Sequence, residues 1–506
     1  MRRHALSDHA FAELGAGRPS LATVAELRRA EVSRHLLLLR ALRPSPGYAR
    51  LRALEREDPV AFRRAVEDPL TGAWAAAQLR TAVAGAAMEL PRDNARRLVA
   101  EQGGLSIEVR LEDADDRRGL LGLTPTGRLA EVDAAHWERC FTEAWRVLAS
   151  RHRDAALLLR AVLTCVVPVE ADPAAAGISA TSADAFGAVA MSMPADGVSL
   201  AVGLLHEAQH SLLNATSHLF DLHERPRDLG YSPWRDDPRP ASGILHGAYA
   251  YLAVTRFWRT ESAAASGEGQ AVAESAAGGG RVARFEYERW REAVSETADR
   301  LLAAGTLTRA GTSFVAALAE EVRPWSAEPF PNPEIARLAR MANADHYARW
   351  RLRNMTPDPA GVAALAQAWR EGKDPPEVRS TLRPPTRRAL PRSPRLHRIH
   401  ALLREDPSLR DPSWTGAEEA AHGRDGGVSG QWRVRRATAS ELAFLRGDQG
   451  TFRRSYLESD FDLDPTALAI AAGAHGRIEA LVAVWQRLRG EGVDPVALAD
   501  WLGTSS

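Results

Sequence analysis

The sequence has few of the features that define specialised protein classes. Its 506 residues include two cysteines, Cys140 and Cys165. Two are too few for a disulfide framework or a cluster-binding motif, so each is expected to be a small buried residue. No apolar run approaches the roughly 18 residues of a membrane span, and the basic N-terminus lacks the apolar segment of a secretory signal. We therefore expect a cytoplasmic protein with no membrane partner.

Lysine is almost missing as well. Lys373 is the only lysine, so arginine supplies nearly all of the positive charge. Lys plus Arg and Asp plus Glu both number 65, which gives a formal net charge of zero. Because the acids match the arginines, the arginine excess is more typical of a GC-rich bacterial genome than of a polyanion-binding surface. We expect no nucleic-acid partner.

Helical patterns dominate what is present. Apolar residues recur at helical spacing over most of the chain, and only three short segments are typical of strands. The pattern predicts a mainly α fold with a small β-sheet, an α+β class. The clearest helical segments are 22–42, 59–101 (broken at Pro69 and Pro91) and 283–354, and the predicted strands lie within 105–111, 160–170 and 186–194.

The composition changes near residue 370. Residues 371–396 hold six prolines among charged residues and no periodic apolar face, which is typical of a linker. We therefore predict a catalytic region over 1–370, a linker over 371–396 and a small helical appendage over 397–506. Polar, glycine-rich stretches at 266–280 and 422–430 are predicted to be loops.

One helical stretch carries a metal-site pattern. In "SLAVGLLHEAQHSLL" (199–213), His206 and His210 lie four residues apart and therefore project from the same helix face, where both imidazoles can reach one ion. Glu207 lies on the adjacent face, close enough to act on a ligand of that ion. The motif H-E-x-x-H predicts a metal site with His206 and His210 as ligands. The alternative is a pair of partly exposed histidines bridged by Glu207.

A third ligand is needed, because two histidines alone hold an ion weakly. His218 lies about 12 Å along the same helix, too far to share the ion unless the helix breaks. We favour His246, which opens the amphipathic stretch "HGAYAYLAVTRFWR" and would place the site between two helices. The alternative for His246 is a capping or core histidine. The other candidates within fifty residues are Asp221, His223 and Glu224.

The stretch "YSPWRDDPRP" (231–240) is unusual for a connection. Arg235 and Arg239 could simply pair with Asp236 and Asp237. Alternatively, one guanidinium holds a carboxylate of a ligand by two parallel hydrogen bonds, a geometry that lysine lacks. We favour Arg239 for this role, because prolines flank it and stiffen its backbone.

Several blocks of the chain together resemble a known family. "TSADAFGAVAMSMP", the histidine helix and "LGYSPWRDDPRPASGILHGAYAYLAVTRFW" are similar to the HExxH-motif peptide-modification family. These are 2-oxoglutarate-dependent peptide β-hydroxylases associated with ribosomal peptide biosynthesis. The resemblance runs from about residue 5 to 355 and includes "SRHLLLLRAL" and "DHYARWRLRN". The region after 371 matches no part of it.

The resemblance implies a dioxygenase that uses Fe(II) and the cosubstrate 2-oxoglutarate. It implies His206, His210 and His246 as iron ligands on a zincin-like metal helix, with Arg235 or Arg239 holding the cosubstrate. It further implies hydroxylation of a side-chain Cβ in a precursor peptide, with the leader segment of that peptide as a candidate binding element and Glu207 orienting a ligand near the metal.

Two other functions are compatible with the same residues. In a zinc metallopeptidase, Zn(II) would replace iron and Glu207 would be the general base. A non-catalytic helical scaffold would bind a peptide or protein, with 397–506 as the docking part. The peptidase needs neither oxygen nor 2-oxoglutarate and leaves a cleaved product, which separates it from the hydroxylase.

Overall fold

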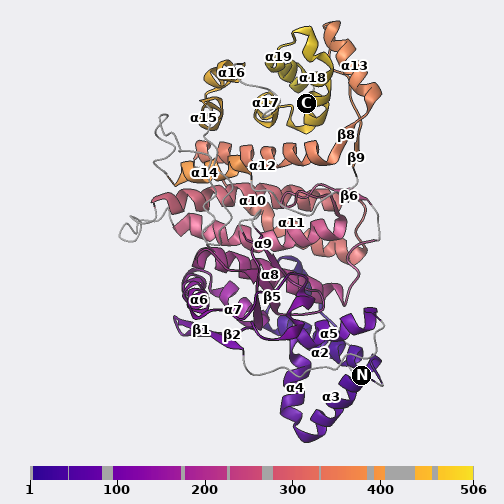
Figure 1. Cartoon of the computed structure of the whole chain (residues 1–506), viewed down its shortest axis with the longest axis vertical. Coiled ribbons are helices and arrows are strands. Elements are labelled where there is room, and N and C mark those ends of the chain that lie inside the picture. Colours follow the sequence, from indigo (N-terminus) through magenta and orange to yellow (C-terminus); the bar gives the residue numbers. More distant parts are fainter. Residues whose placement is uncertain are drawn as a thin grey trace. The chain divides into compact units, whose positions relative to one another are not determined.

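The structure, a computed structural model, is mainly helical with one small mixed sheet (Figure 1), which confirms the α+β prediction. Among the residues described, no helix is long and apolar enough to cross a membrane. The predicted loop at 422–430 lies outside these residues, as does most of the one at 266–280. The described residues are 4–43, 45–81, 95–172, 177–224, 228–264, 277–329, 332–383, 393–404, 439–457 and 465–504.

The chain forms two compact units that do not follow the predicted division at residue 370. One apolar core in unit 2 includes residues from Val282 to Leu502, so chain on both sides of residue 370 contributes to it. Part of the predicted linker is a strand, Ser380–Leu382, paired with Met355–Pro357. Unit 1 comprises residues 1–227, 241–260 and 290–328, and unit 2 comprises 228–240, 261–289 and 329–506.

The five-stranded sheet lies in unit 1 and has the strand order β1-β2-β3-β5-β4. β2, β3 and β5 run parallel, whereas β1 and β4 are antiparallel edge strands. Every residue of β3 and β5 is buried, as expected for central strands. The strands are β1 (Arg96–Gln102), β2 (Leu105–Leu111), β3 (Cys165–Val169), β4 (Ser179–Ala180) and β5 (Ala188–Ser192).

The helical prediction for 59–101 is wrong at its end, because residues from Arg96 onward form β1. Gly103 and Gly104 follow, both with positive φ (56° and 72°), and they turn the chain directly into β2. Two consecutive residues with positive φ make the tight turn of an antiparallel hairpin. The turn at the glycine pair therefore allows residues 96–102 to pair with β2 as a strand. Apolar periodicity alone does not reveal this strand.

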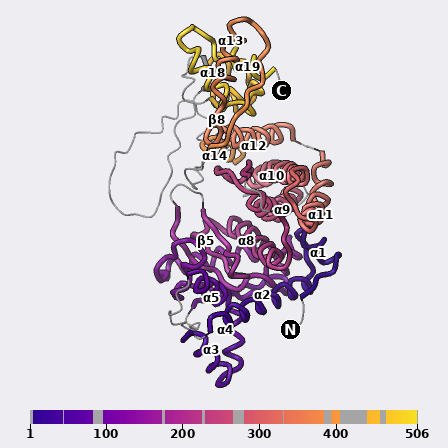
Figure 2. The backbone as a smooth tube through the Cα atoms, turned by 90° about the vertical axis from the view of Figure 1, so that its right-hand side faces the viewer, coloured from indigo at the N-terminus to yellow at the C-terminus, as the bar shows by residue number. Residues whose placement is uncertain are grey.

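Helices pack against the sheet in unit 1, α6 against β1 and α8 against β4 and β5. α2, α6 and α7 all pack against α8, the helix that follows β5 (Figures 1 and 2). Both cysteines are buried and unbonded here, as expected. The helices are α1 (Asp8–Gly15), α2 (Leu21–Ala41), α3 (Pro46–Glu57), α4 (Pro59–Glu67), α5 (Pro69–Thr81), η1 (Asp116–Leu121), α6 (Glu131–Arg151), α7 (Arg153–Val162), α8 (Gly197–Ser217) and α11 (Arg309–Ser326), while α9 (Ala241–Ala264) and α10 (Ala277–Ala303) contribute to both units.

Unit 2 is almost entirely helical within the described ranges. Its core is formed by apolar side chains from several helices, among them Leu338, Leu365 and Leu481, all fully buried. Its elements are β6 (Leu229–Gly230), β7 (Arg239–Pro240), α12 (Pro333–Asn354), β8 (Met355–Pro357), α13 (Pro359–Arg370), β9 (Ser380–Leu382), α14 (Pro394–Leu403), α15 (Ala439–Arg446), α16 (Gln449–Leu457), α17 (Pro465–Ala471), η5 (His475–Arg477), α18 (Ile478–Leu488), η6 (Arg489–Glu491) and α19 (Pro495–Gly503).

Gly187, just before β5, is the basis of a stability prediction. Its φ is +86°, and an added Cβ would overlap the carbonyl oxygen of Val162 and lie 2.9 Å from Thr164 Oγ1. Left-handed strain and overpacking together should make Gly187→Ala cost about 3 kcal/mol of unfolding free energy. The measurement is the midpoint of urea unfolding. The control is Gly104→Ala, which has φ +72° but open space around the new Cβ and should cost only about 1 kcal/mol. Equal losses in the two variants would contradict the close approach at Gly187.

Candidate metal centre

Helix α8 positions the H-E-x-x-H residues. Asp196 caps its N-terminus: the Asp196 side chain accepts from Ser199 N–H, and Ser199 Oγ lies 3.1 Å from Asp196 N. Leucines along the helix, including Leu204 and Leu212, are fully buried in unit 1. The helix is therefore fixed at its start and along its apolar face.

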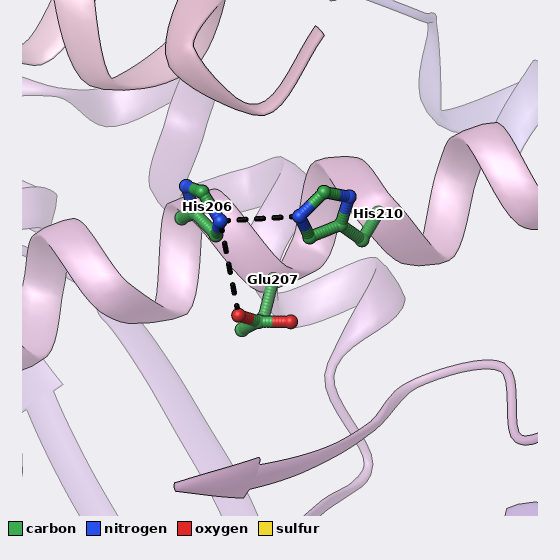
Figure 3. A group of neighbouring side chains, drawn as sticks. All are labelled: His206, Glu207 and His210. Carbon is green, nitrogen blue, oxygen red and sulfur yellow. Dashed lines mark hydrogen bonds and ion pairs between the residues drawn. The ribbon is translucent and has the colours of Figure 1, made fainter. Parts of the chain in front are cut away.

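His206 and His210 point toward one another (Figure 3). Their Nε2 atoms are 3.1 Å apart. Two nitrogens at this separation either share a hydrogen bond or bind one ion, for which Nε2–metal bonds of about 2.1 Å would enclose an angle of roughly 95°. The spacing therefore suits adjacent ligands of one metal ion.

Burial keeps both imidazoles neutral. It lowers the pKa of His206 and, further, that of His210, where protonation of His206 or His246 would add repulsion. A histidine binds a metal through a neutral nitrogen, so a lowered pKa removes the competition from protons at pH 7. His206 is still about a quarter exposed, so small molecules can reach it.

Glu207 is fixed by two hydroxyl groups. Ser179 Oγ donates to its Oε1 at 2.6 Å, and Thr181 Oγ1 donates to its Oε2 at 2.5 Å. The residue is 1% exposed, and its Oε1 lies 3.9 Å from His206 Nε2. The carboxylate is therefore held beside the histidine pair in one orientation.

Ser179 and Thr181 were not predicted as site residues. They lie in and just after β4, which pairs with β5 through Ser179↔Met191 and Ala180↔Ala190. The block "TSADAFG" marked their region, but a two-residue strand has no periodicity that would reveal which side chains face α8.

His246 lies on the far side of the His210 ring. Its Nδ1 is 3.4 Å from His210 Nδ1, the nitrogen that does not face His206. Among the described residues, the group whose ligand atoms come together is His206, Glu207 and His210. His246 is thus brought next to a predicted ligand, and its own role as a ligand stays a prediction.

The other third-ligand candidates are outside this group. His218 Nδ1 lies 2.7 Å from Glu31 Oε1, so this imidazole already has a carboxylate partner. Asp221 and Glu224 use backbone atoms to bond Thr308 and Thr306, and His223 forms a bridge with Leu307.

The arginine-rich loop belongs to unit 2, whereas the histidines belong to unit 1. Both arginines bind Asp237: Arg235 Nε donates to Oδ1 at 3.0 Å, and Arg239 donates through a terminal nitrogen to Oδ2 at 3.2 Å. The Nε atom of Arg239 is buried without a hydrogen-bond partner in the described residues. One N–H of Arg239 therefore makes no hydrogen bond within the described residues.

Asp236 makes its side-chain contacts with α12. Its carboxylate is 3.4 Å from Arg353 and 3.7 Å from His346 Nε2, and its backbone carbonyl accepts from Asn354. Tyr231 Oη is 2.9 Å from His346 Nδ1. The blocks "YSPWRDDPRP" and "DHYARWRLRN" thus meet within unit 2.

No protein-family model matches the chain, and no curated protein matches it.

Proposed function

We propose that this protein is an Fe(II)- and 2-oxoglutarate-dependent hydroxylase that modifies a side-chain Cβ of a ribosomally made precursor peptide. The observation that carries the metal part of this proposal is the pair of facing Nε2 atoms of His206 and His210. The hydroxylase part extends the sequence resemblance. In this proposal α8 is a zincin-like metal helix, and 397–506 is a helical appendage.

The residues present fit the proposed metal. Neutral imidazoles suit both iron and zinc, and the 3.1 Å spacing suits neighbouring ligand positions. His206 and His210 would hold the ion, with His246 proposed as the third ligand. When bound, iron with 2-oxoglutarate supplies the oxygen chemistry that no side chain can provide.

The proposed cosubstrate also has a candidate partner. A dicarboxylate bound to a metal at one end leaves a carboxylate at the other, which is costly to bury unless a cation meets it. Arg239 is the candidate, because its buried Nε lacks a partner among the described residues. Asp237 would hold its guanidinium in place.

Glu207 favours the hydroxylase over a zinc peptidase. A peptidase requires Glu207 to take a proton from metal-bound water, and its distance of 3.9 Å from His206 Nε2 is compatible with that. However, each carboxylate oxygen already accepts a hydroxyl hydrogen bond, from Ser179 or Thr181. That arrangement suits a group that positions its neighbours rather than one that exchanges protons.

The variant Glu207→Gln distinguishes the hydroxylase from the zinc peptidase. Hydroxyl groups can donate or accept, so Ser179 and Thr181 can also hold an amide. We expect unchanged metal content and a loss of less than about tenfold in hydroxylation, whereas removal of a peptidase's general base should cost about 10²–10⁴-fold. Metal analysis and single-turnover product formation measure the two quantities. A loss of a thousandfold with full metal content would favour proton transfer by Glu207.

The proposed function is tested with a candidate precursor peptide encoded beside this gene. The peptide is incubated with wild-type protein, iron and 2-oxoglutarate, with and without oxygen. The mass of the intact peptide is then measured by mass spectrometry. We expect a gain of one oxygen atom per modified residue that requires both oxygen and 2-oxoglutarate. Cleavage that proceeds without either would identify a peptidase instead.

A further inference from the structure

Helix α2 exposes leucines that the site described above does not use. In the run of four leucines 36–39, Leu39 is buried at 3% exposure, whereas Leu36 and Leu37 are 44% and 48% exposed. Two adjacent, half-exposed leucines cost solvation unless something covers them. They lie within "SRHLLLLRAL", a block that the metal centre leaves unexplained.

These leucines line a hollow in unit 1. The hollow has a volume of about 990 Å³, and Val32, Leu36, Leu37 and Leu219 supply part of its apolar lining. On α2, residues 32, 36 and 40 follow one another at intervals of four along one helix face. A row with this spacing forms a ridge, and a second helix can lay its own ridge in the groove beside it. We name this feature the α2 hollow.

Charged residues of both signs line the α2 hollow, four arginines with Glu31 and Glu67. Arg29 and Arg34 already pair with Glu26 and Asp184, and Arg28 donates to two backbone carbonyls. Glu31 is only 3% exposed and faces His218, so its charge contributes little at the surface. Arg40 is exposed and has no hydrogen-bond or ion-pair partner among the described residues. An apolar floor beside an unpartnered arginine favours a partner that is apolar on one face and acidic on the other.

The α2 hollow is continuous with the metal helix. His218 caps the C-terminus of α8, and both it and Leu219 line the hollow. Leu219 follows His210 by nine residues, which is about 14 Å along a helix. Four or five extended residues span that distance. A segment seated in the hollow could therefore present a neighbouring residue to the metal centre.

We propose that the α2 hollow binds an acidic, amphipathic helix belonging to the peptide substrate, outside the residue that is modified. The identification of this helix as part of the substrate rests on the proposed function, whereas the binding itself does not. Leucines of the bound helix pack on Leu36 and Leu37, and its acids face Arg40. This mode is the placement of an amphipathic helix in a groove.

Synthetic peptides test the inference on the full chain. One fluorescent 20-residue peptide has leucines at helical spacing among glutamates, and its partner has every glutamate replaced by lysine. We expect the acidic peptide to bind at least tenfold more tightly in fluorescence anisotropy, with an affinity that falls as salt is added. Leu36→Glu and Arg40→Glu should each weaken binding at least tenfold. Val132→Glu, at a 71% exposed position on α6, is the matched control and should bind as wild type does.

Three results would overturn the inference. One is equal affinity for the two peptides. Another is an affinity for the acidic peptide that Leu36→Glu leaves unchanged. The third is concentration-dependent dimerisation abolished by Leu36→Glu, which would identify a second copy of the chain as the occupant. The proposed function can be tested separately from this inference, because His206→Ala should lose metal binding and still bind the acidic peptide. If the wild type binds iron and hydroxylates its substrate but does not bind the acidic peptide, only the proposed role of the α2 hollow is refuted.

Discussion

His206→Ala and His210→Ala should each reduce metal affinity by more than about 100-fold. Substitutions that only disturb the support of a metal ligand already cost 10–100-fold, so loss of a ligand should cost more. The reason lies in the 3.1 Å contact between the Nε2 atoms, since removal of either imidazole leaves the other as a single weak ligand. Competition titrations of Fe(II) or Zn(II) against a chromophoric chelator measure the change, and hydroxylation should be lost with it.

His9→Ala is the matched control for these variants. His9 lies on α1, is 85% exposed and pairs only with Glu13 at 3.3 Å among the interactions described for it. Its removal should leave metal affinity unchanged, because a surface pair of this kind contributes little. Wild-type metal content in both His206→Ala and His210→Ala would exclude α8 as the metal site.

Arg239→Lys should weaken 2-oxoglutarate binding to the metal-loaded protein by at least about tenfold, which corresponds to about 1.4 kcal/mol. The substitution keeps the charge but removes the planar pair of donors that matches a carboxylate. It also removes the buried Nε–H that lacks a partner among the described residues. Isothermal titration of 2-oxoglutarate into the iron-loaded protein under anaerobic conditions measures the affinity.

Arg235→Lys serves as the comparison within the same loop. The Nε of Arg235 already donates to Asp237, so this arginine has less to offer a ligand than Arg239. We expect Arg235→Lys to have the smaller effect. If both variants bind 2-oxoglutarate as wild type does, the loop has only a structural role, and the proposed cosubstrate depends on the sequence resemblance alone.

Local signals predicted much of the fold. α2 (Leu21–Ala41) and β2 (Leu105–Leu111) lie within one residue of their predicted bounds, because an amphipathic helix and an alternating strand each carry their own periodicity. The segment that forms β1 was predicted to be helical, because the alanine-rich composition before it favours helix and a turn at two glycines has no periodicity. The extent of each element therefore followed from sequence where its pattern was long and regular.

The surroundings of the metal centre could not be predicted in the same way. The proximity of His206 to His210 follows from helix geometry alone. The hydroxyl groups that hold Glu207 depend instead on the pairing of β4 with β5 and on the packing of α8 beside them. His246 was placed next to His210, but which of its nitrogens faces the ring depends on side-chain packing that spacing does not describe.

X-ray absorption on the full chain loaded with one equivalent of Fe(II), repeated with Zn(II), tests the metal centre most directly. It distinguishes imidazole nitrogens from oxygen ligands and gives their distances from the ion. We expect at least two imidazole nitrogens at about 2.0–2.2 Å, reduced by one in His206→Ala and in His210→Ala. A coordination shell of oxygen atoms alone, or the same imidazole signal in both variants, would contradict the assignment of the metal to His206 and His210.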